Sequence, residues 1–125
     1  MFHILVVDDD KNTRQLIKAV LETENYIVIG ATDGEDALKV LDRSHIDLVI
    51  LDVMMPKMDG YEFTEILRRV QNELPILMVS AKQLPADRNK GFIVGTDDFM
   101  TKPFDEEELL LRVKALLRRA KIVNE

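Results

Sequence analysis

Four charged side chains lie at the ends of, or shortly after, apolar segments that have the composition of β-strands. Asp8 and Asp9 come directly after ILVV, Asp52 follows LVIL, and Lys102 stands in the later motif TKPF. If these segments are parallel strands of one sheet, their carboxyl ends share one edge and the charges converge in one crevice. The sequence therefore predicts an acidic pocket with a single ammonium group beside it.

Clustered carboxylates of this kind require compensation. Three of them within a few ångströms would either raise a pKa or need a cation. A set of oxygen ligands without histidine or cysteine nearby favours Mg²⁺, which keeps several waters and often bridges to a phosphate. Lys102 can pair with a phosphoryl oxygen, and Ser80, at the end of MVS, offers a hydroxyl at the same edge. These residues together predict a site that holds Mg²⁺ and a phosphoryl group.

Asp52 is the predicted acceptor of that phosphoryl group. Asp8 and Asp9 are paired and suited to hold metal, whereas Asp52 stands alone before VMMPKMDG. A carboxylate can attack phosphorus and form an aspartyl phosphate. We interpret Asp10 as an N-cap or an exposed residue and not as a ligand, because an acid after a strand often caps the following helix.

The elements that must position these residues alternate along the chain. Short apolar runs and segments of helical period predict five βα units and a parallel sheet. The expected strands are 4–7, 27–31, 48–51, 76–79 and 99–100. The first, third and fourth are nearly continuous aliphatic runs, as strands covered on both faces should be, so we expect them at the centre of the sheet.

Steps of three and four residues give the expected helices one apolar stripe each. The stripe of the first helix consists of Leu16, Ile17, Val20 and Leu21, and that of the third consists of Phe63, Ile66, Leu67 and Val70. The second helix is expected over 34–43 with Asp33 as its N-cap, and the fifth over 106–120. The fourth, over 86–94, has the weakest pattern, since it begins near a proline and contains Gly91.

Composition limits the classes of function. A chain of 125 residues, 46% of them hydrophobic, suits one compact domain, expected over 1–120 with a linker starting at 121–125. The net charge of −6 argues against direct binding of duplex DNA, which needs a basic surface. The absence of cysteine excludes thiolate sites and suits the cytoplasm. No apolar run reaches the roughly 20 residues that cross a bilayer, so we expect no membrane contact.

Four motifs resemble those of one known family. VVDDD, LDVMMPKMDG, MVSA and GTDDFMTKPF occur in the order and spacing of receiver domains of bacterial two-component response regulators, over essentially the whole chain. The resemblance implies a flavodoxin-like, doubly wound (βα)5 fold with strand order 2-1-3-4-5 and the site at its switch point. It also implies phosphoryl transfer from a sensor histidine kinase or a small phosphodonor, with Mg²⁺ or Mn²⁺, and slow autodephosphorylation.

By the same resemblance, each site residue has a role. Asp9 is implied as the principal metal ligand together with Asp52, while Asp8 acts largely through water and Met54 through its backbone carbonyl. Ser80 resembles the switch hydroxyl that moves toward the phosphoryl group, and Phe99 the aromatic ring that turns inward with it. Lys102 resembles the phosphate-contacting lysine, and its bond to Pro103 is expected to be cis.

The chain also resembles the subfamily whose output is a winged-helix DNA-binding domain. In that subfamily, phosphorylation controls a symmetric dimer, which would here use residues 86–94, 99–100 and 106–120. The implied dimer face comprises Arg88, Phe92, Asp98, Glu108, Leu111, Arg112 and Arg119. Asp98 of one copy would pair with Arg112 of the other, and Arg88 with Glu108. The chain differs from the subfamily at Ile93 and Val94. There the subfamily often has an acidic residue that pairs with the residue that Arg119 matches. The alternative interpretation is that these charged residues form only a solvated surface.

Other functions compete with this interpretation. A haloacid-dehalogenase-like phosphatase would fit Asp8 and Asp10, but Asn12 stands where it needs Thr or Val, and the chain is short. A flavin or nucleotide module would need a Gly-, Ser- or Thr-rich first loop to cradle phosphate. A pseudo-receiver disagrees with the intact site residues, whereas a stand-alone receiver that acts by docking remains possible from the sequence.

Overall fold

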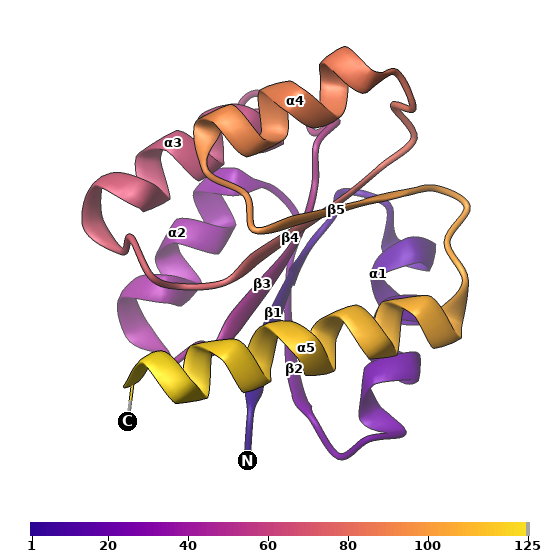
Figure 1. Cartoon of the computed structure of the whole chain (residues 1–125), viewed down its shortest axis with the longest axis vertical. Helices are drawn as coiled ribbons and strands as arrows, with labels where there is room; N and C mark the ends of the chain where they lie inside the picture. The colour runs from indigo at the N-terminus through magenta and orange to yellow at the C-terminus, as the bar shows by residue number, and fades with distance from the viewer. Residues whose placement is uncertain (125) are drawn as a thin grey trace.

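Five parallel strands form one sheet at the centre of the molecule (Figure 1). The computed structural model describes the backbone of residues 1–124 and the side chains of residues 1–120. The strands are β1 His3–Val7, β2 Ile27–Ala31, β3 Leu48–Asp52, β4 Ile76–Ser80 and β5 Asp98–Thr101. They are ordered β2-β1-β3-β4-β5, which confirms the predicted flavodoxin-like topology and the central position of the three aliphatic strands.

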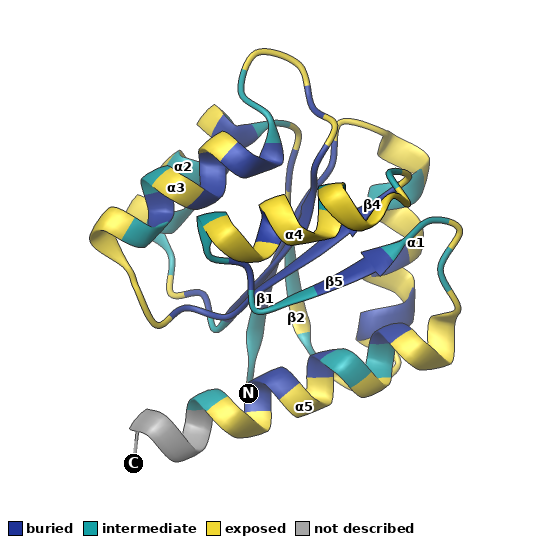
Figure 2. Cartoon of the chain, turned by 45° about the horizontal axis from the view of Figure 1, so that its top comes forward, coloured by how far each residue is buried: buried dark blue, intermediate teal, exposed yellow. Residues whose placement is uncertain are grey.

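Helices cover both faces of the sheet, and each face has its own core. The helices are α1 Lys11–Glu22, α2 Gly34–Arg43, α3 Gly60–Val70, α4 Pro85–Val94 and α5 Glu106–Asn124. Residues of α1 and α5 pack on one face with Ile4 and Val6, and residues of α2 and α3 pack on the other with Leu5 and Val7. This alternation follows from the two-residue period of a strand. Figure 2 shows the resulting pattern, with buried central strands, a partly exposed edge strand β2 and exposed outer faces on the helices.

Aspartates begin the first three helices. Asp10, Asp33 and Asp59 are the N-caps of α1, α2 and α3, and their carboxylates accept hydrogen bonds from backbone N–H groups in the first turn of each helix. These bonds satisfy donors that the helix itself leaves free. The capping interpretation of Asp10 and Asp33 is therefore confirmed.

Two residues of the predicted apolar stripes are exposed instead of buried. Leu16 is 46% exposed and Val70 is 75% exposed. Leu16 lies at the edge of its stripe, where the neighbouring Ile17 takes the position toward the sheet. Val70 is the last residue of α3 and is followed by an exposed turn, so the helix end has no sheet to cover it. Both assignments were wrong.

The last helix is longer than the sequence predicts. It continues to Asn124, whereas its pattern predicts an end at residue 120. The expected linker start at 121–125 falls on this final turn and on residue 125, which lies outside the described residues, so the boundary stays a prediction. Among the described residues, no helix combines the length and apolar character needed to cross a membrane.

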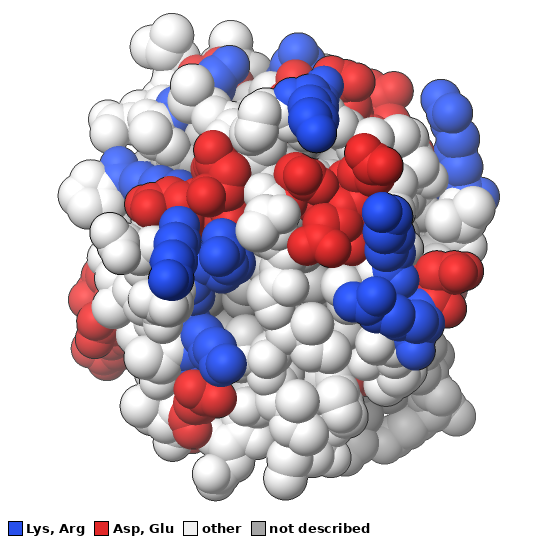
Figure 3. Space-filling model, turned by 180° about the vertical axis from the view of Figure 1, so that it is seen from behind, with Lys and Arg blue, Asp and Glu red and all other residues white. Residues whose placement is uncertain are grey.

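Acidic and basic side chains are interspersed on the face of the molecule seen in Figure 3. That face carries no continuous basic stripe of the kind that binding to a phosphate backbone requires. The observation agrees with the net charge of −6.

Candidate functional site

Three carboxylates meet at the edge of the sheet where the strands end. Asp8 follows β1, Asp52 ends β3, and these two strands are hydrogen-bonded neighbours. One carboxylate oxygen from each of Asp8, Asp9 and Asp52 lies within 4.8 Å of the others. Asp8 is 2% exposed and Asp52 is 7% exposed, whereas Asp9 is open to solvent. The predicted cluster therefore exists, with two buried carboxylates and one at the opening.

The predicted ammonium group stands beside the cluster. The Nζ atom of Lys102 is 3.0 Å from Oδ2 of Asp8 and 3.5 Å from Oδ2 of Asp52. The backbone N–H of Lys102 donates to the carbonyl of Ser80 at 2.7 Å, which ties the end of β5 to the end of β4. The Lys102-Pro103 bond is cis, as expected.

The electrostatics of the pocket are unbalanced. Burial raises the pKa of Asp52; Lys102 lowers it in part, and the charge of Asp8 raises it further. Burial alone would lower the pKa of Lys102, but its hydrogen bond to Asp8 and the charge of Asp52 raise the pKa overall. Lys102 therefore stays charged, and one ammonium group faces three carboxylates. A divalent cation would offset the excess negative charge.

The chemistry of the donors fits Mg²⁺. The three carboxylates offer only hard oxygen ligands, and Asp9 leaves the site open for the waters that this ion retains. Beside Asp9 lies a hollow of about 470 Å³, lined in part by Met54, Met55, Pro56 and Lys82. The hollow gives a small phosphate compound access to the edge of the site.

The two predicted switch residues are both buried in this structure. Ser80 ends β4, and its Oγ accepts a hydrogen bond from the backbone N–H of Lys82 at 3.1 Å. Phe99 lies in β5, and its ring packs beneath Gly91 of α4. The guanidinium carbon of Arg88 is 5.6 Å from the centre of this ring. The Phe99 ring is thus turned inward, under α4, which belongs to the predicted dimer face.

The loop after Asp52 is held by a close approach of the backbone. A Cβ atom on Gly60 would lie 2.7 Å from the carbonyl oxygen of Asp52 and 2.8 Å from Cα of Val53. The N–H of Gly60 donates to the carbonyl of Val53 at 2.8 Å, and that of Met54 donates to Oδ1 of Asp52 at 3.3 Å. The start of α3 therefore fixes the segment that carries Asp52.

Sequence reasoning missed two residues that support the site. Arg14 donates from Nη1 to the carbonyl of Asp8 at 2.7 Å and so holds the β1–α1 loop. Tyr61 donates to the carbonyl of Asp87 at 3.0 Å, and Nζ of Lys90 lies 4.5 Å from the centre of its ring. The sequence gives no sign of the role of Arg14, because its hydrogen-bond partner is a backbone carbonyl, which every residue carries. Tyr61 follows Gly60 directly, so the motif DGY was its available signal.

The predicted dimer face contains ion pairs within a single chain. Arg112 donates from Nη1 to both carboxylate oxygens of Asp98, each at 2.9 Å, and from Nη2 to Glu108 at 3.1 Å. The hydrogen bond to Asp98 raises the pKa of Arg112. Arg119 lies 3.6 Å from Asp97 of the same chain, whereas Ile93 and Val94 offer it no acidic partner. The predicted pairs between copies stay a prediction.

The chain matches known proteins over nearly its whole length. The family model described as the response regulator receiver domain matches residues 4–114. The alkaline phosphatase synthesis transcriptional regulatory protein PhoP of Bacillus subtilis is 48% identical over 119 residues, which are 95% of this chain and 50% of that protein. The transcriptional regulatory protein CpxR of Escherichia coli is 46% identical over 96% of this chain and 51% of its own. This chain spans about half the length of these curated relatives.

Solved structures agree with the fold, and one of them contains Mg²⁺ and BeF. The receiver domain of the Francisella response regulator 1452 superposes with a TM-score of 0.90 at 35% identity and covers 95% of this chain and 98% of its own. The response regulator TrrA of Thermotoga maritima, solved in complex with Mg²⁺ and BeF, has a TM-score of 0.85 at 35% identity, over 93% of this chain and 99% of its own. Since the family model spans most of the sequence and the fold and acidic pocket agree with it, this chain belongs to the response regulator receiver domain family.

Proposed function

We propose that this receiver domain is a covalent switch in which Asp52 accepts the phosphoryl group. One observation carries the proposal: the Asp52 carboxylate is nearly buried, yet it lies beside two further carboxylates and 3.5 Å from the Lys102 ammonium group. Membership in the receiver family also leaves the phosphatase and flavin-module alternatives without support.

The transfer needs a nucleophile, a cation and room for a donor. An oxygen of Asp52 forms the new bond to phosphorus while the bond between phosphorus and its leaving atom breaks, nitrogen in a kinase phosphohistidine or oxygen in acetyl phosphate. When bound by Asp9, Asp52 and the Met54 carbonyl, with Asp8 acting through water, Mg²⁺ (or Mn²⁺) supplies charge for the phosphoryl oxygens. Lys102 stabilises the same oxygens from the other side.

The acquired charge then changes the neighbourhood of Asp52. A phosphoryl oxygen competes with Asp8 for the Lys102 ammonium group, 3.0 Å from Asp8 before transfer. The Ser80 hydroxyl, which accepts a bond from Lys82, is free to donate to that oxygen. Movement of Ser80 opens space beside β4 and β5, and Phe99 with its covering helix α4 responds. A local electrostatic event thus biases the packing of the α4–β5–α5 face.

The first experiment labels the protein with acetyl phosphate and Mg²⁺ and follows the intact mass. The wild type should gain one phosphoryl group, and Asp52→Asn should gain none. Asp10→Asn is the matched control, because Asp10 caps α1 and Asn caps equally well. It should be labelled like the wild type. Labelling of Asp52→Asn at the wild-type level would refute the assignment.

We further propose that phosphorylation promotes a homodimer through the α4–β5–α5 face, with the sensor histidine kinase as phosphoryl donor and DNA contacted only through a separate output domain. The relatives named as transcriptional regulators are about twice as long as this chain, which supports a further domain in proteins of this kind. In a dimer, Arg112 would exchange its own Asp98 for that of the second copy. Such an exchange conserves the number of ion pairs, so the exposed apolar residues Phe92 and Leu111 supply the net stabilisation.

Sedimentation velocity tests the dimer. Beryllofluoride with Mg²⁺ should increase self-association of the wild type. Burial of one leucine contributes about 1.5–3 kcal/mol, so Leu111→Ser should weaken the dimer roughly tenfold or more. Val70→Ser, at an even more exposed aliphatic position on α3, should not weaken it. Sedimentation that beryllofluoride leaves unchanged over a wide concentration range would contradict the dimer but not the phosphorylation of Asp52.

A further inference from the structure

The two histidines of the chain lie together, although they are far apart in the sequence. His3 begins β1, and His45 lies in the loop between α2 and β3. The centres of their rings are 6.1 Å apart and the ring planes meet at 75°. Both stand at the edge where the strands begin, at the opposite end of the sheet from Asp8 and Asp52. No motif in the sequence predicts this pairing.

Asp47 places a carboxylate next to both rings. Its Oδ1 is 2.8 Å from Nε2 of His45, and its Oδ2 is 3.8 Å from Nδ1 of His3. The backbone fixes this carboxylate, because the N–H of His3 donates to Oδ2 at 2.7 Å and the N–H of Asp47 donates to the carbonyl of His3 at 2.8 Å. Two imidazole nitrogens therefore face one immobile carboxylate.

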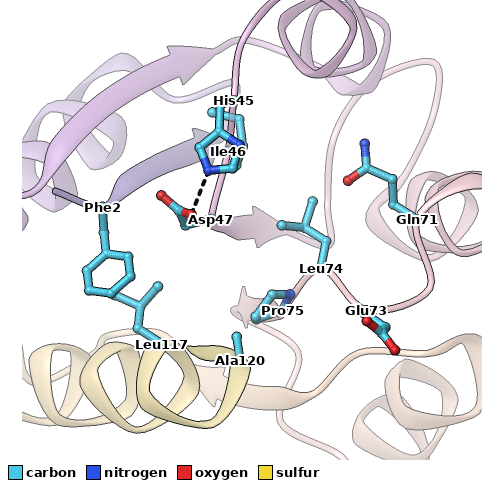
Figure 4. A pocket seen from close by; sticks show the side chains of 10 residues that line it. All are labelled: Phe2, His45, Ile46, Asp47, Gln71, Glu73, Leu74, Pro75, Leu117 and Ala120. Atoms are coloured by element: carbon cyan, nitrogen blue, oxygen red, sulfur yellow. Dashed lines mark hydrogen bonds and ion pairs between the residues drawn. The ribbon is translucent and has the colours of Figure 1, made fainter. Parts of the chain in front are cut away.

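One of these nitrogens lacks a hydrogen-bond partner in the part of the chain that the structure describes. Nδ1 of His3 is buried and has no hydrogen-bond partner among the described residues, which is costly for a polar atom. On the other side of Asp47 the surface is hollowed: His45 and Asp47 line a cavity of about 410 Å³ (Figure 4). The side chain of His45 is 77% exposed, so solvent surrounds its ring and a hydrogen bond to Asp47 holds it. The cluster combines a hydrogen-bonded carboxylate, a buried nitrogen without a described partner and an exposed imidazole at an open cavity.

We propose that His3, His45 and Asp47 bind a transition-metal ion of the Zn²⁺ class. Two imidazole nitrogens and one carboxylate oxygen are a donor set that Zn²⁺ accepts, with water in the fourth position. Among the described residues, only Asp8, Asp9 and Asp52 already have their ligand atoms all within 4.8 Å of one another. Binding at the histidine cluster therefore requires His45 to turn from its hydrogen bond with Asp47 toward an ion shared with His3.

The two ends of the sheet would select different metals. The pocket at Asp52 gathers carboxylates and so offers oxygen ligands, which suit Mg²⁺. The histidine cluster offers nitrogen ligands, which Zn²⁺ favours and Mg²⁺ does not. Bound metal would join the first residue of β1 to the loop before β3. It would thereby stabilise the folded chain by mass action, without touching the phosphoryl site.

Isothermal titration with Zn²⁺, in excess Mg²⁺ that occupies the acidic pocket, tests the proposal. The wild type should bind one Zn²⁺ at the cluster, and His45→Gln and His3→Gln should each weaken this binding roughly tenfold or more. Glu73→Gln removes a carboxylate from the far wall of the same cavity and is the matched control, which should bind Zn²⁺ as the wild type does. Substitution of Asp47 is less useful, since Asp47 also holds the backbone of His3.

Three further measurements separate this site from the acidic pocket. Asp9→Asn should retain the Zn²⁺ site, and Co²⁺ should give a visible absorption spectrum that His45→Gln removes. Labelling by acetyl phosphate should be the same in His45→Gln and in the wild type. The proposal is overturned if the wild type binds no Zn²⁺ in excess Mg²⁺, if both histidine variants bind it normally, or if only Asp9→Asn abolishes the binding.

Discussion

The buried position of Asp52 lowers the stability of the unphosphorylated protein. Burial raises its pKa above the ordinary value of 3.8, and Lys102 compensates only in part. The unfolded chain therefore ionises this carboxyl at a lower pH than the folded chain does. The cost of ionised Asp52 appears as pH rises past the unfolded pKa and is complete above the folded pKa. At neutral pH the site holds a charge that the fold alone does not stabilise.

Replacing this charge should therefore stabilise the protein. Without Mg²⁺, Asp52→Asn should unfold at a higher temperature than the wild type at pH 7, because the variant buries no charge there. The advantage should shrink as the pH falls through the raised pKa of Asp52 and vanish below the unfolded pKa. Thermal denaturation over a pH series measures both effects.

Asp10→Asn supplies a control of opposite sign. The hydrogen bond from the Thr13 hydroxyl lowers the pKa of Asp10, so its charge favours the folded state above the unfolded pKa and this benefit is lost as the pH falls. This variant should gain no stability at pH 7. If Asp52→Asn were less stable than the wild type at pH 7, the charge of Asp52 would not destabilise the folded protein.

Among the elements, α3 has a direct part in placing the acceptor. Its first residue, Gly60, approaches the backbone of Asp52 and Val53 so closely that no side chain fits between them. Glycine is required here by space, since the residue has no unusual backbone angle in the structure. The helix start and the end of β3 therefore behave as one rigid unit.

Gly60→Ala should separate these two elements. A Cβ atom 2.7 Å from the Asp52 carbonyl forces the backbone to move, with a cost of about 1–3 kcal/mol in the free energy of unfolding. The displaced Asp52 should also be labelled more slowly by acetyl phosphate. Denaturant unfolding and intact mass measure the two effects.

Gly34→Ala is the control, because Gly34 is likewise the first residue of a helix and its added Cβ would meet only the flexible side chain of Met58, whose sulfur lies 2.8 Å away. It should change the labelling rate little. Equal labelling rates in the Gly60 variant and the wild type would show that α3 does not position the acceptor.

The elements were predictable where their sequence pattern is local. Continuous aliphatic runs identified β1, β3 and β4, and Asp33 before a helical stripe identified the start of α2. Val70 was misplaced because periodicity does not show where a helix extends past the sheet. Arg68 was not anticipated at all. It donates to the carbonyls of Gly95 and Leu74 and to the carboxylate of Asp97, and most of these partners are distant in sequence.

At the scale of the whole molecule, the parallel sheet separates two kinds of chemistry. Asp8, Asp9, Asp52 and Lys102 lie together at the edge where the strands end. This grouping is predictable from the positions of the strand ends alone, because parallel strands bring their carboxyl ends to one edge. The other edge of the sheet gathers His3 and His45, which no pattern predicts, because a loop places the second of them. On the α4–β5–α5 face, Arg112 already forms ion pairs with Asp98 and Glu108 of the same chain. In the proposed function, phosphorylation of Asp52 is the event to which this face responds.

The most direct test of this account locates the phosphoryl group on the chain. The protein is labelled with acetyl phosphate and Mg²⁺ and reduced with borohydride, which converts an acyl phosphate of aspartate to homoserine, and its peptides are sequenced by mass spectrometry. The account predicts homoserine at position 52, dependent on acetyl phosphate and on Mg²⁺. Conversion at Asp8 or Asp9 in place of Asp52, or conversion at no aspartate while the intact mass shows a phosphoryl group, would contradict it.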